Sequence, residues 1–171
     1  MAPLFERRGG RHATMVHGTD GLYLEPCGPE QGPLACARAS HDGELHSRRD
    51  AEGNWVLRVP DAEMAKIPPS RIDHLGGPAG TLVLLNCRTI HGSAPNHSAR
   101  PRPFLLNVFS SADAFPYTAN PLPTPYAGAI VRGEPAPWAH HDPRPCEIPP
   151  DWSAGYVGPW KHQQTATVTA G

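Results

Sequence analysis

The chain has 171 residues, a formal net charge of −1 at pH 7 and an isoelectric point near 6.8. This length suits one domain, and the balanced charge gives no electrostatic reason to expect nucleic acid or an anionic membrane as a partner. No apolar run is long enough to cross a bilayer, and the first residues lack the hydrophobic segment of a signal peptide. We therefore expect a cytoplasmic protein.

Proline and glycine are the compositional outliers, with 22 and 17 residues. They fall mainly outside the apolar runs, which predicts short strands and long irregular loops and nearly excludes long helices. The four cysteines form no Cys-x-x-Cys pair. Reduced, structural thiols are therefore expected rather than a zinc site.

In the first half of the chain, residues 1–30 show no clear periodicity and are expected to be an irregular N-terminal segment. A short strand followed by a turn is expected within 31–45. Alternating apolar residues predict another short strand at 54–59. Asp61 can cap one or two helical turns over 62–67.

In the second half, residues 81–86 are apolar and β-branched and make the strongest strand prediction. The next strand is expected at 102–110. Residues 121–150 are rich in proline and are expected to wrap the surface, with one short extended piece at 129–131. Short strands separated by such loops favour an all-β sandwich or jelly roll.

The segment around His91 combines two features of an oxygenase site. His91 follows the apolar run at 81–86, and Arg102 opens the next apolar run eleven residues later. Non-haem iron(II) oxygenases hold the metal with two histidines and one carboxylate and leave open positions for 2-oxoglutarate and oxygen. The far carboxylate of 2-oxoglutarate needs a fixed cation, and arginine offers a permanently charged, bidentate fork. Two antiparallel strands would bring these residues to one pocket.

Residues 80–109 resemble the second metal-ligand region of the phytanoyl-CoA dioxygenase family, which includes ectoine hydroxylase. The family pattern of a strand, His-Gly-Ser, x-x-Asn-x-Ser, an arginine and a second strand is matched by His91, Gly92, Ser93, Asn96, Ser98 and Arg102. Residues 31–41 are similar to the family's asparagine-Gly-Pro-Leu … Gly-Ser-His segment. The resemblance covers about residues 30–135, the later half of the usual family domain.

The resemblance implies a double-stranded β-helix, a cupin-like jelly roll that is incomplete in this chain. It also implies iron(II), 2-oxoglutarate and hydroxylation of a small molecule. By the resemblance, His91 is an iron ligand and Arg102 anchors 2-oxoglutarate. Ser93 and Asn96 would lie near the co-substrate.

The corresponding division of the chain is an irregular segment at 1–30, a partial jelly-roll oxygenase domain at 31–135, and a proline-rich extension at 136–171.

One part of the family pattern is missing. The family has an upstream His-x-Asp pair that supplies the other two iron ligands, and this sequence contains none. His17 and Asp20 are the nearest substitute, but residues i and i+3 of a strand point to opposite faces, so only a turn would bring them together. The sequence therefore resembles a family member that lacks its N-terminal part.

Other interpretations stay open at this point. His91 can be an ordinary loop histidine, Arg102 a surface arginine, and His140-His141-Asp142 a solvated loop. The chain can also be a non-catalytic, truncated remnant of the family that serves as a binding or assembly module or has no function. A cupin-like sugar-binding protein or isomerase would be favoured if His17, His91 and His97 converged on a metal without Arg102 nearby.

Overall fold

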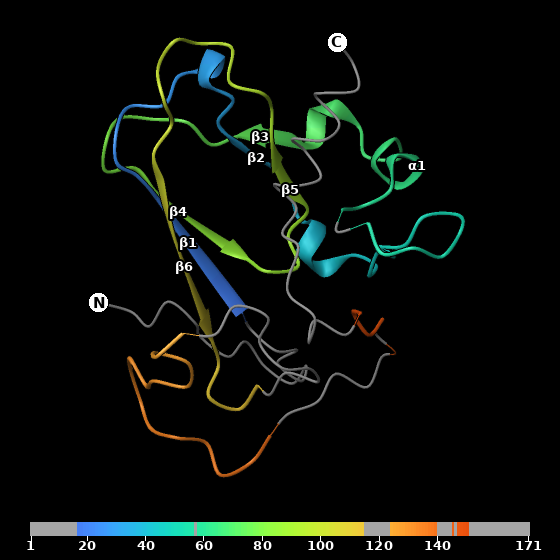
Figure 1. The fold of residues 1–171 in the computed structure, drawn as a ribbon, viewed down its shortest axis with the longest axis vertical. Coiled ribbons are helices and arrows are strands. Elements are labelled where there is room, and N and C mark those ends of the chain that lie inside the picture. The colour runs from blue at the N-terminus through green and yellow to red at the C-terminus, as the bar shows by residue number, and fades with distance from the viewer. Residues whose placement is uncertain (1–16, 57, 115–123, 140–144, 146, 151–171) are drawn as a thin grey trace.

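The structure is a computed structural model that describes residues 17–56, 58–114, 124–139, 145 and 147–150 (Figure 1). Its elements, in chain order, are β1 (His17–Tyr23), η1 (Pro29–Gln31), β2 (Leu34–Ala37), η2 (Ser40–Asp42), α1 (Asp61–Met64), η3 (Pro69–Arg71), β3 (Ile72–His74), β4 (Leu82–Asn86), β5 (His91–Ser93) and β6 (Phe104–Ser110), where η marks a 3-10 helix. The only α-helix among these residues is one turn long, so the described fold is all-β, as the composition predicts. In the same residues no helix has the length and apolar character needed to cross a membrane.

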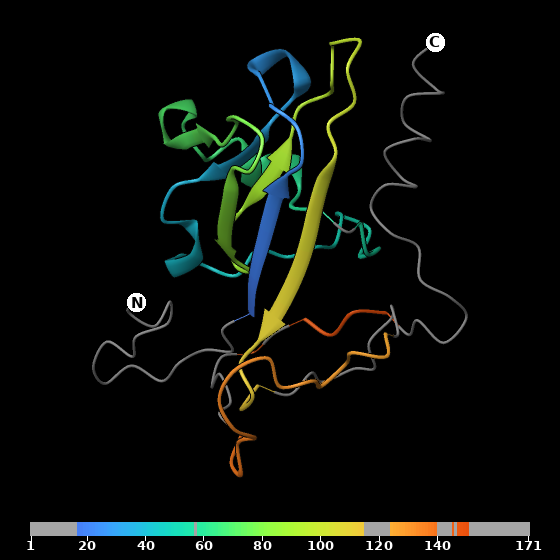
Figure 2. The same cartoon turned by 90° about the vertical axis from the view of Figure 1, so that its left-hand side faces the viewer.

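The strands form two small antiparallel sheets, ordered β4–β1–β6 and β3–β2–β5. In Figure 1 the β3–β2–β5 sheet lies above the other, and Figure 2 shows β1 running between β4 and β6. The predicted strands near 81–86 and 102–110 are confirmed as β4 and β6, and the strand expected within 31–45 is β2. The jelly roll itself stays a prediction.

Two local predictions need correction. The segment expected to be irregular before residue 30 contains β1, which is the central strand of its sheet. The strand expected at 54–59 is reduced to a single bridge between Arg49 and Trp55, because the Asp50 carboxylate accepts hydrogen bonds from the Asn54 backbone at 2.8 Å and closes a turn. Residues 129–131, where a short extended piece is expected, follow a turn at 125–128 and are not paired in a sheet.

The expected helix after Pro60 exists but is shorter and is capped differently. It covers Asp61–Met64, and Asp61 is its first residue rather than its cap. The Asp61 carboxylate pairs with the Arg58 guanidinium, so it is not used to cap backbone N–H groups. The His140-His141-Asp142 segment, interpreted as a solvated loop, lies outside the described residues.

The core lies where the two sheets meet. Its buried residues are Tyr23, Cys27, Leu34 and Val83, with Leu75, Leu85 and Phe104 packed against them. The Tyr23 hydroxyl accepts a hydrogen bond from the Leu34 backbone N–H at 2.8 Å and so joins β1 to β2. The Tyr23 and Phe104 rings lie 4.5 Å apart, and the Phe104 ring fills the space where a side chain at Gly21 would be.

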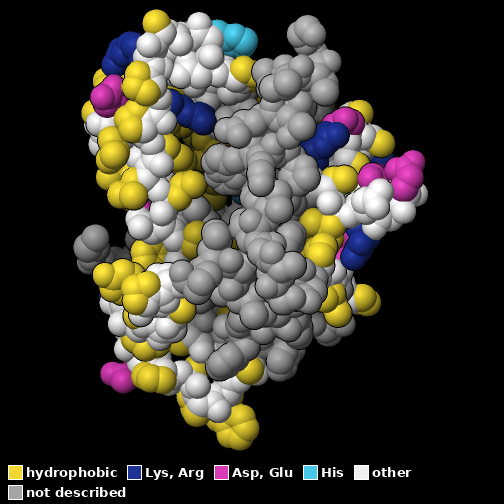
Figure 3. Space-filling model, viewed as in Figure 1, with side chains coloured by type: hydrophobic (Ala, Val, Ile, Leu, Met, Phe, Trp, Pro, Cys, Tyr) yellow, Lys and Arg dark blue, Asp and Glu magenta, His cyan; other side chains and the backbone are white. Residues whose placement is uncertain are grey.

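Beyond this core, many apolar side chains are exposed, as the yellow surface of Figure 3 shows. Side chains alternate along a strand, so Phe104, Leu106 and Val108 share one face of β6. Phe104 packs against the core, whereas Leu106 and Val108 are 48% and 69% exposed. The core therefore occupies one end of this face and leaves the rest open.

Candidate functional site

His91 and Ser93 lie on β5, an edge strand of the β3–β2–β5 sheet. The register pairs His91 with Cys36 and Ser93 with Leu34. Directly paired residues of an antiparallel sheet project from the same face. Because Leu34 belongs to the core between the sheets, His91 and Ser93 also face that side.

Arg102 reaches Ser93 from the loop two residues before β6. Its Nη1 donates to Ser93 Oγ at 3.0 Å and also to the Gly32 carbonyl oxygen. Both bonds use the two hydrogens of one nitrogen, so in the described part of the chain Nη2 and Nε keep donors for a ligand. The Ser93 hydroxyl accepts from Arg102 and can therefore donate its own hydrogen outward. Together these groups suit a carboxylate.

The His91 ring is held in one orientation. Its Nδ1 lies 2.8 Å from the Thr89 carbonyl oxygen. A carbonyl oxygen only accepts, so Nδ1 carries a hydrogen, and in the neutral ring Nε2 presents its lone pair. A histidine whose other ring nitrogen donates to a carbonyl is the usual form of a metal ligand. The side chain is exposed and therefore accessible.

The spacing of these groups suits a short dicarboxylate. His91 and Ser93 are two residues apart on one strand, which places their Cα atoms about 7 Å apart. Arg102 is hydrogen-bonded to Ser93, so its guanidinium lies at the Ser93 end of this spacing, away from His91. A small molecule with a carboxylate at one end can contact Arg102 and still extend toward His91.

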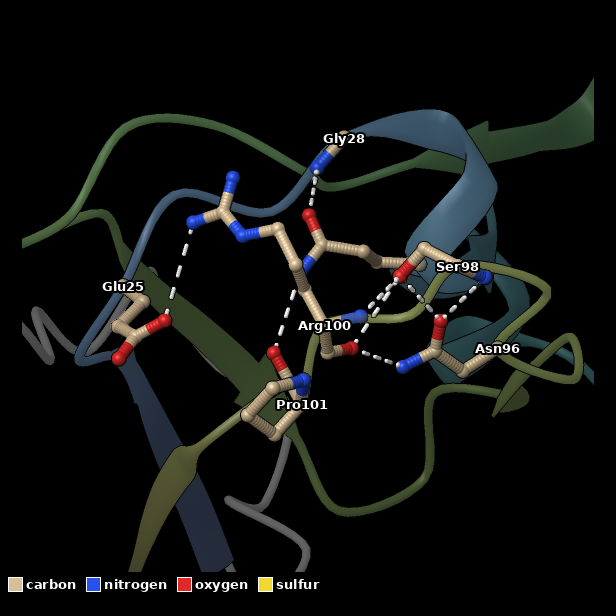
Figure 4. A network of polar contacts seen from close by, with 7 residues as sticks. Glu25, Gly28, Asn96, Ser98, Arg100 and Pro101 are labelled. Atoms are coloured by element: carbon tan, nitrogen blue, oxygen red, sulfur yellow. Dashed lines mark hydrogen bonds and ion pairs between the residues drawn. The ribbon is translucent and has the colours of Figure 1, made fainter.

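Asn96 is placed differently from the other three predicted site residues. Its side-chain amide donates to the Arg100 carbonyl at 2.7 Å, and its oxygen accepts from the Ser98 backbone and hydroxyl at 2.9 and 2.8 Å (Figure 4). These bonds all lie within the loop between β5 and β6. The structure thus brings His91, Ser93 and Arg102 to one region, while the Asn96 amide is used to shape the loop.

The metal ligands are not assembled in the described residues. Asp20 projects from the face of β1 opposite to Tyr23, and its carboxylate accepts from Asn107 Nδ2 at 3.2 Å. The idea that a turn brings His17 and Asp20 together is therefore wrong, because both belong to a regular strand. Among the described residues, no three His, Cys, Asp or Glu side chains are grouped closely enough to hold a metal. These residues fit a carboxylate but do not by themselves form an iron site.

The cupin-like interpretation required three histidines to converge without Arg102 nearby. The side chain of one of them, His17, is not among those that the structure describes. The Arg102 guanidinium bonds to the residue two positions after His91.

Cys36 is a neighbour of His91 that the sequence did not single out. It pairs with His91 on one side and with Asp73 on the other, so the three side chains form a row across the sheet. Burial raises the pKa of the Cys36 thiol, and the Asp73 carboxylate raises it further. The Arg38 guanidinium, bonded to Asp73 at 2.7 and 3.0 Å, lowers the pKa of that carboxyl. Only strand register reveals this row.

Comparison with known proteins agrees with the resemblance. A family model described as Phytanoyl-CoA dioxygenase (PhyH) matches residues 6–104, a region that contains His91 and Arg102. The match begins earlier and ends sooner than the expected 30–135. The chain is also 36% identical over 100 residues to a Stutzerimonas stutzeri protein named "Probable alpha-ketoglutarate-dependent hypophosphite dioxygenase". This alignment covers 57% of the chain and 35% of that relative. The chain belongs to the phytanoyl-CoA dioxygenase family.

Proposed function

We propose that the chain forms the 2-oxoglutarate-binding part of an iron(II)-dependent dioxygenase that hydroxylates or otherwise oxidises a small molecule. The observation that carries the proposal is the contact between Arg102 and Ser93, on the same side of β5 as His91. The family match and the name of the Stutzerimonas stutzeri relative support 2-oxoglutarate as the co-substrate. A jelly-roll arrangement of the strands belongs to the same proposal.

Each residue has a distinct role in this proposal. Nη2 and Nε of Arg102, with the Ser93 hydroxyl, bind the far carboxylate of 2-oxoglutarate. Nε2 of His91 serves as one iron ligand, and its orientation is kept by the Thr89 carbonyl. Bound iron(II) would supply the oxygen chemistry. Asn96 acts indirectly, because its hydrogen bonds shape the loop that leads to Arg102.

A second candidate is a non-catalytic dicarboxylate-binding module. It is favoured by the absence of a three-ligand metal group among the described residues. Such a module would use Arg102 and Ser93 in the same way but would not turn over 2-oxoglutarate. Turnover and binding therefore have to be measured separately.

The test uses two variants of the site and two matched controls. His91→Ala should abolish formation of succinate from 2-oxoglutarate. Arg102→Ala should weaken 2-oxoglutarate binding by about 10- to 100-fold, the usual effect of losing a hydrogen bond to a charged group. His97→Ala and Arg100→Ala should leave both properties unchanged, because Arg100 pairs with Glu25 at 3.8 Å instead of with Ser93.

The results separate the candidates. Turnover that depends on His91 supports the dioxygenase. Binding that depends on Arg102 without turnover supports the binding module. If the His91→Ala variant retains full turnover, or if Arg102→Ala binds 2-oxoglutarate as tightly as the wild type, the proposed site is wrong. Anaerobic titration with iron(II) and 2-oxoglutarate, followed by the visible absorption of the chelate, gives an independent measure of binding.

A further inference from the structure

The turn at Gly28–Gly32, which contains η1, lies against the loop that leads into β6. The His97 backbone N–H donates to the Glu30 carbonyl at 2.9 Å. The Gly32 carbonyl accepts a hydrogen bond from Arg102. This turn therefore contacts the loop both near its middle and at the residue that carries the guanidinium.

Gln31, at the end of η1, has an unusual environment for an amide. It is 2% exposed, and in the described part of the chain Tyr23 and Gln31 are the two largest fully buried side chains. Its Oε1 accepts from the Gly28 backbone N–H at 2.9 Å, and its Nε2 donates to the Pro101 carbonyl at 3.2 Å. Figure 4 shows both bonds as dashed lines, one ending at the labelled Gly28 and the other at the labelled Pro101. A buried amide of this kind is costly unless both of its ends are bonded, as they are here.

The bond to Pro101 bears directly on Arg102. Pro101 lacks a backbone N–H, so its carbonyl is the one backbone group through which it can be held. That carbonyl immediately precedes the Arg102 backbone. The side chain of Gln31 thus fixes the backbone from which Arg102 projects, and the carbonyl of the next residue, Gly32, fixes the guanidinium.

Gly32 allows the backbone of the turn to lie directly against the backbone of the loop. Its φ is +61°, a left-handed conformation that glycine adopts without strain. A Cβ atom at this position would overlap the Ala94 carbonyl oxygen of the loop. The two backbones are therefore in direct contact, and a change in the turn is passed on to the loop.

We infer that Gln31 is a positioning residue for the carboxylate site. This inference rests on the proposed function, because it gives Gln31 the task of holding Arg102 beside Ser93 for the far carboxylate of 2-oxoglutarate. Gln31 does not touch the ligand. Its buried amide fixes the position of the Arg102 guanidinium through the bond to Pro101.

The test compares two keto acids. 2-Oxoglutarate has the far carboxylate, and 2-oxobutyrate lacks it. Both are titrated calorimetrically into the protein under anaerobic conditions with iron(II). Gln31→Met keeps the length of the side chain and removes the amide. It should raise the dissociation constant of 2-oxoglutarate about tenfold, the effect of losing one buried hydrogen bond, and leave that of 2-oxobutyrate unchanged.

Two further variants define the effect. Gln31→Asn keeps an amide and should restore part of the affinity for 2-oxoglutarate. Glu25→Gln is the control, since it breaks an exposed ion pair with Arg100 in the same region and should change neither constant. If Gln31→Met does not fold, as judged by circular dichroism, Gln31→Glu replaces it. At neutral pH Gln31→Glu keeps the acceptor for Gly28 but cannot donate to Pro101, and the same selective loss is expected.

The outcomes distinguish this inference from the proposed function. If the wild type does not bind 2-oxoglutarate in an Arg102-dependent way, both fail. If the wild type binds in that way and the Gln31 variant binds equally well, the inference alone fails. It also fails if the variant weakens both keto acids to the same extent, because that pattern indicates a general loss of structure.

Discussion

Replacing Tyr23 with phenylalanine removes one hydroxyl from the centre of the core without changing its packing. Tyr23 is 0% exposed, and its hydroxyl accepts the Leu34 N–H at 2.8 Å. In the Tyr23→Phe variant that N–H stays buried without its partner, which costs about 1–3 kcal/mol. For a chain of this length, such a loss lowers the unfolding midpoint by about 2–12 °C.

Thermal and urea unfolding, followed by circular dichroism, measure this loss. Tyr126→Phe is the matched control, because Tyr126 is 79% exposed and its hydroxyl is open to water. The control should unfold within about 0.5 kcal/mol of the wild type. If Tyr23→Phe and Tyr126→Phe have the same free energy of unfolding, the bond between Tyr23 and β2 does not join the two sheets as described.

Two other perturbations test separate features. Gly32→Ala should destabilise the fold by more than about 2 kcal/mol, because strain at positive φ adds to the overlap with the loop. Gly53 also has a positive φ, +85°, but has open space around it. Gly53→Ala should therefore lower the free energy of unfolding by only about 1 kcal/mol in the same urea titration. The raised pKa of Cys36 means that its thiolate forms at higher pH than in the unfolded chain. Alkylation of Cys36, followed by peptide mass spectrometry, should therefore shift to higher pH on folding, and Asp73→Asn should reduce that shift. Equal pH profiles for folded and urea-unfolded protein would contradict the second prediction.

The sequence predicted the strands whose residues have strong intrinsic preferences. β4 and β6 are runs of leucine, valine and phenylalanine, so composition alone identifies them. β1 was missed because its sequence, His-Gly-Thr-Asp-Gly-Leu-Tyr, contains two glycines and an aspartate. Its strand conformation comes from pairing with β4 on one side and β6 on the other, which is tertiary information.

The candidate site was predictable to a different extent. The family pattern identified His91, Ser93 and Arg102, and the structure brings Ser93 and Arg102 into contact. The contribution of Gln31 was not visible, because a glutamine before Gly-Pro has no intrinsic signal of burial. Its bond to Pro101 links residues that are 70 positions apart in the sequence, and only the folded chain shows it.

In β6, the residue that stabilises the core and the residues that face solvent lie on the same side of the strand. Phe104 contributes to stability through the core, whereas Leu106 and Val108, on the same face, remain largely in solvent. Exposed side chains lose little burial when they are exchanged. The strand can therefore be altered at these two positions without loosening the core.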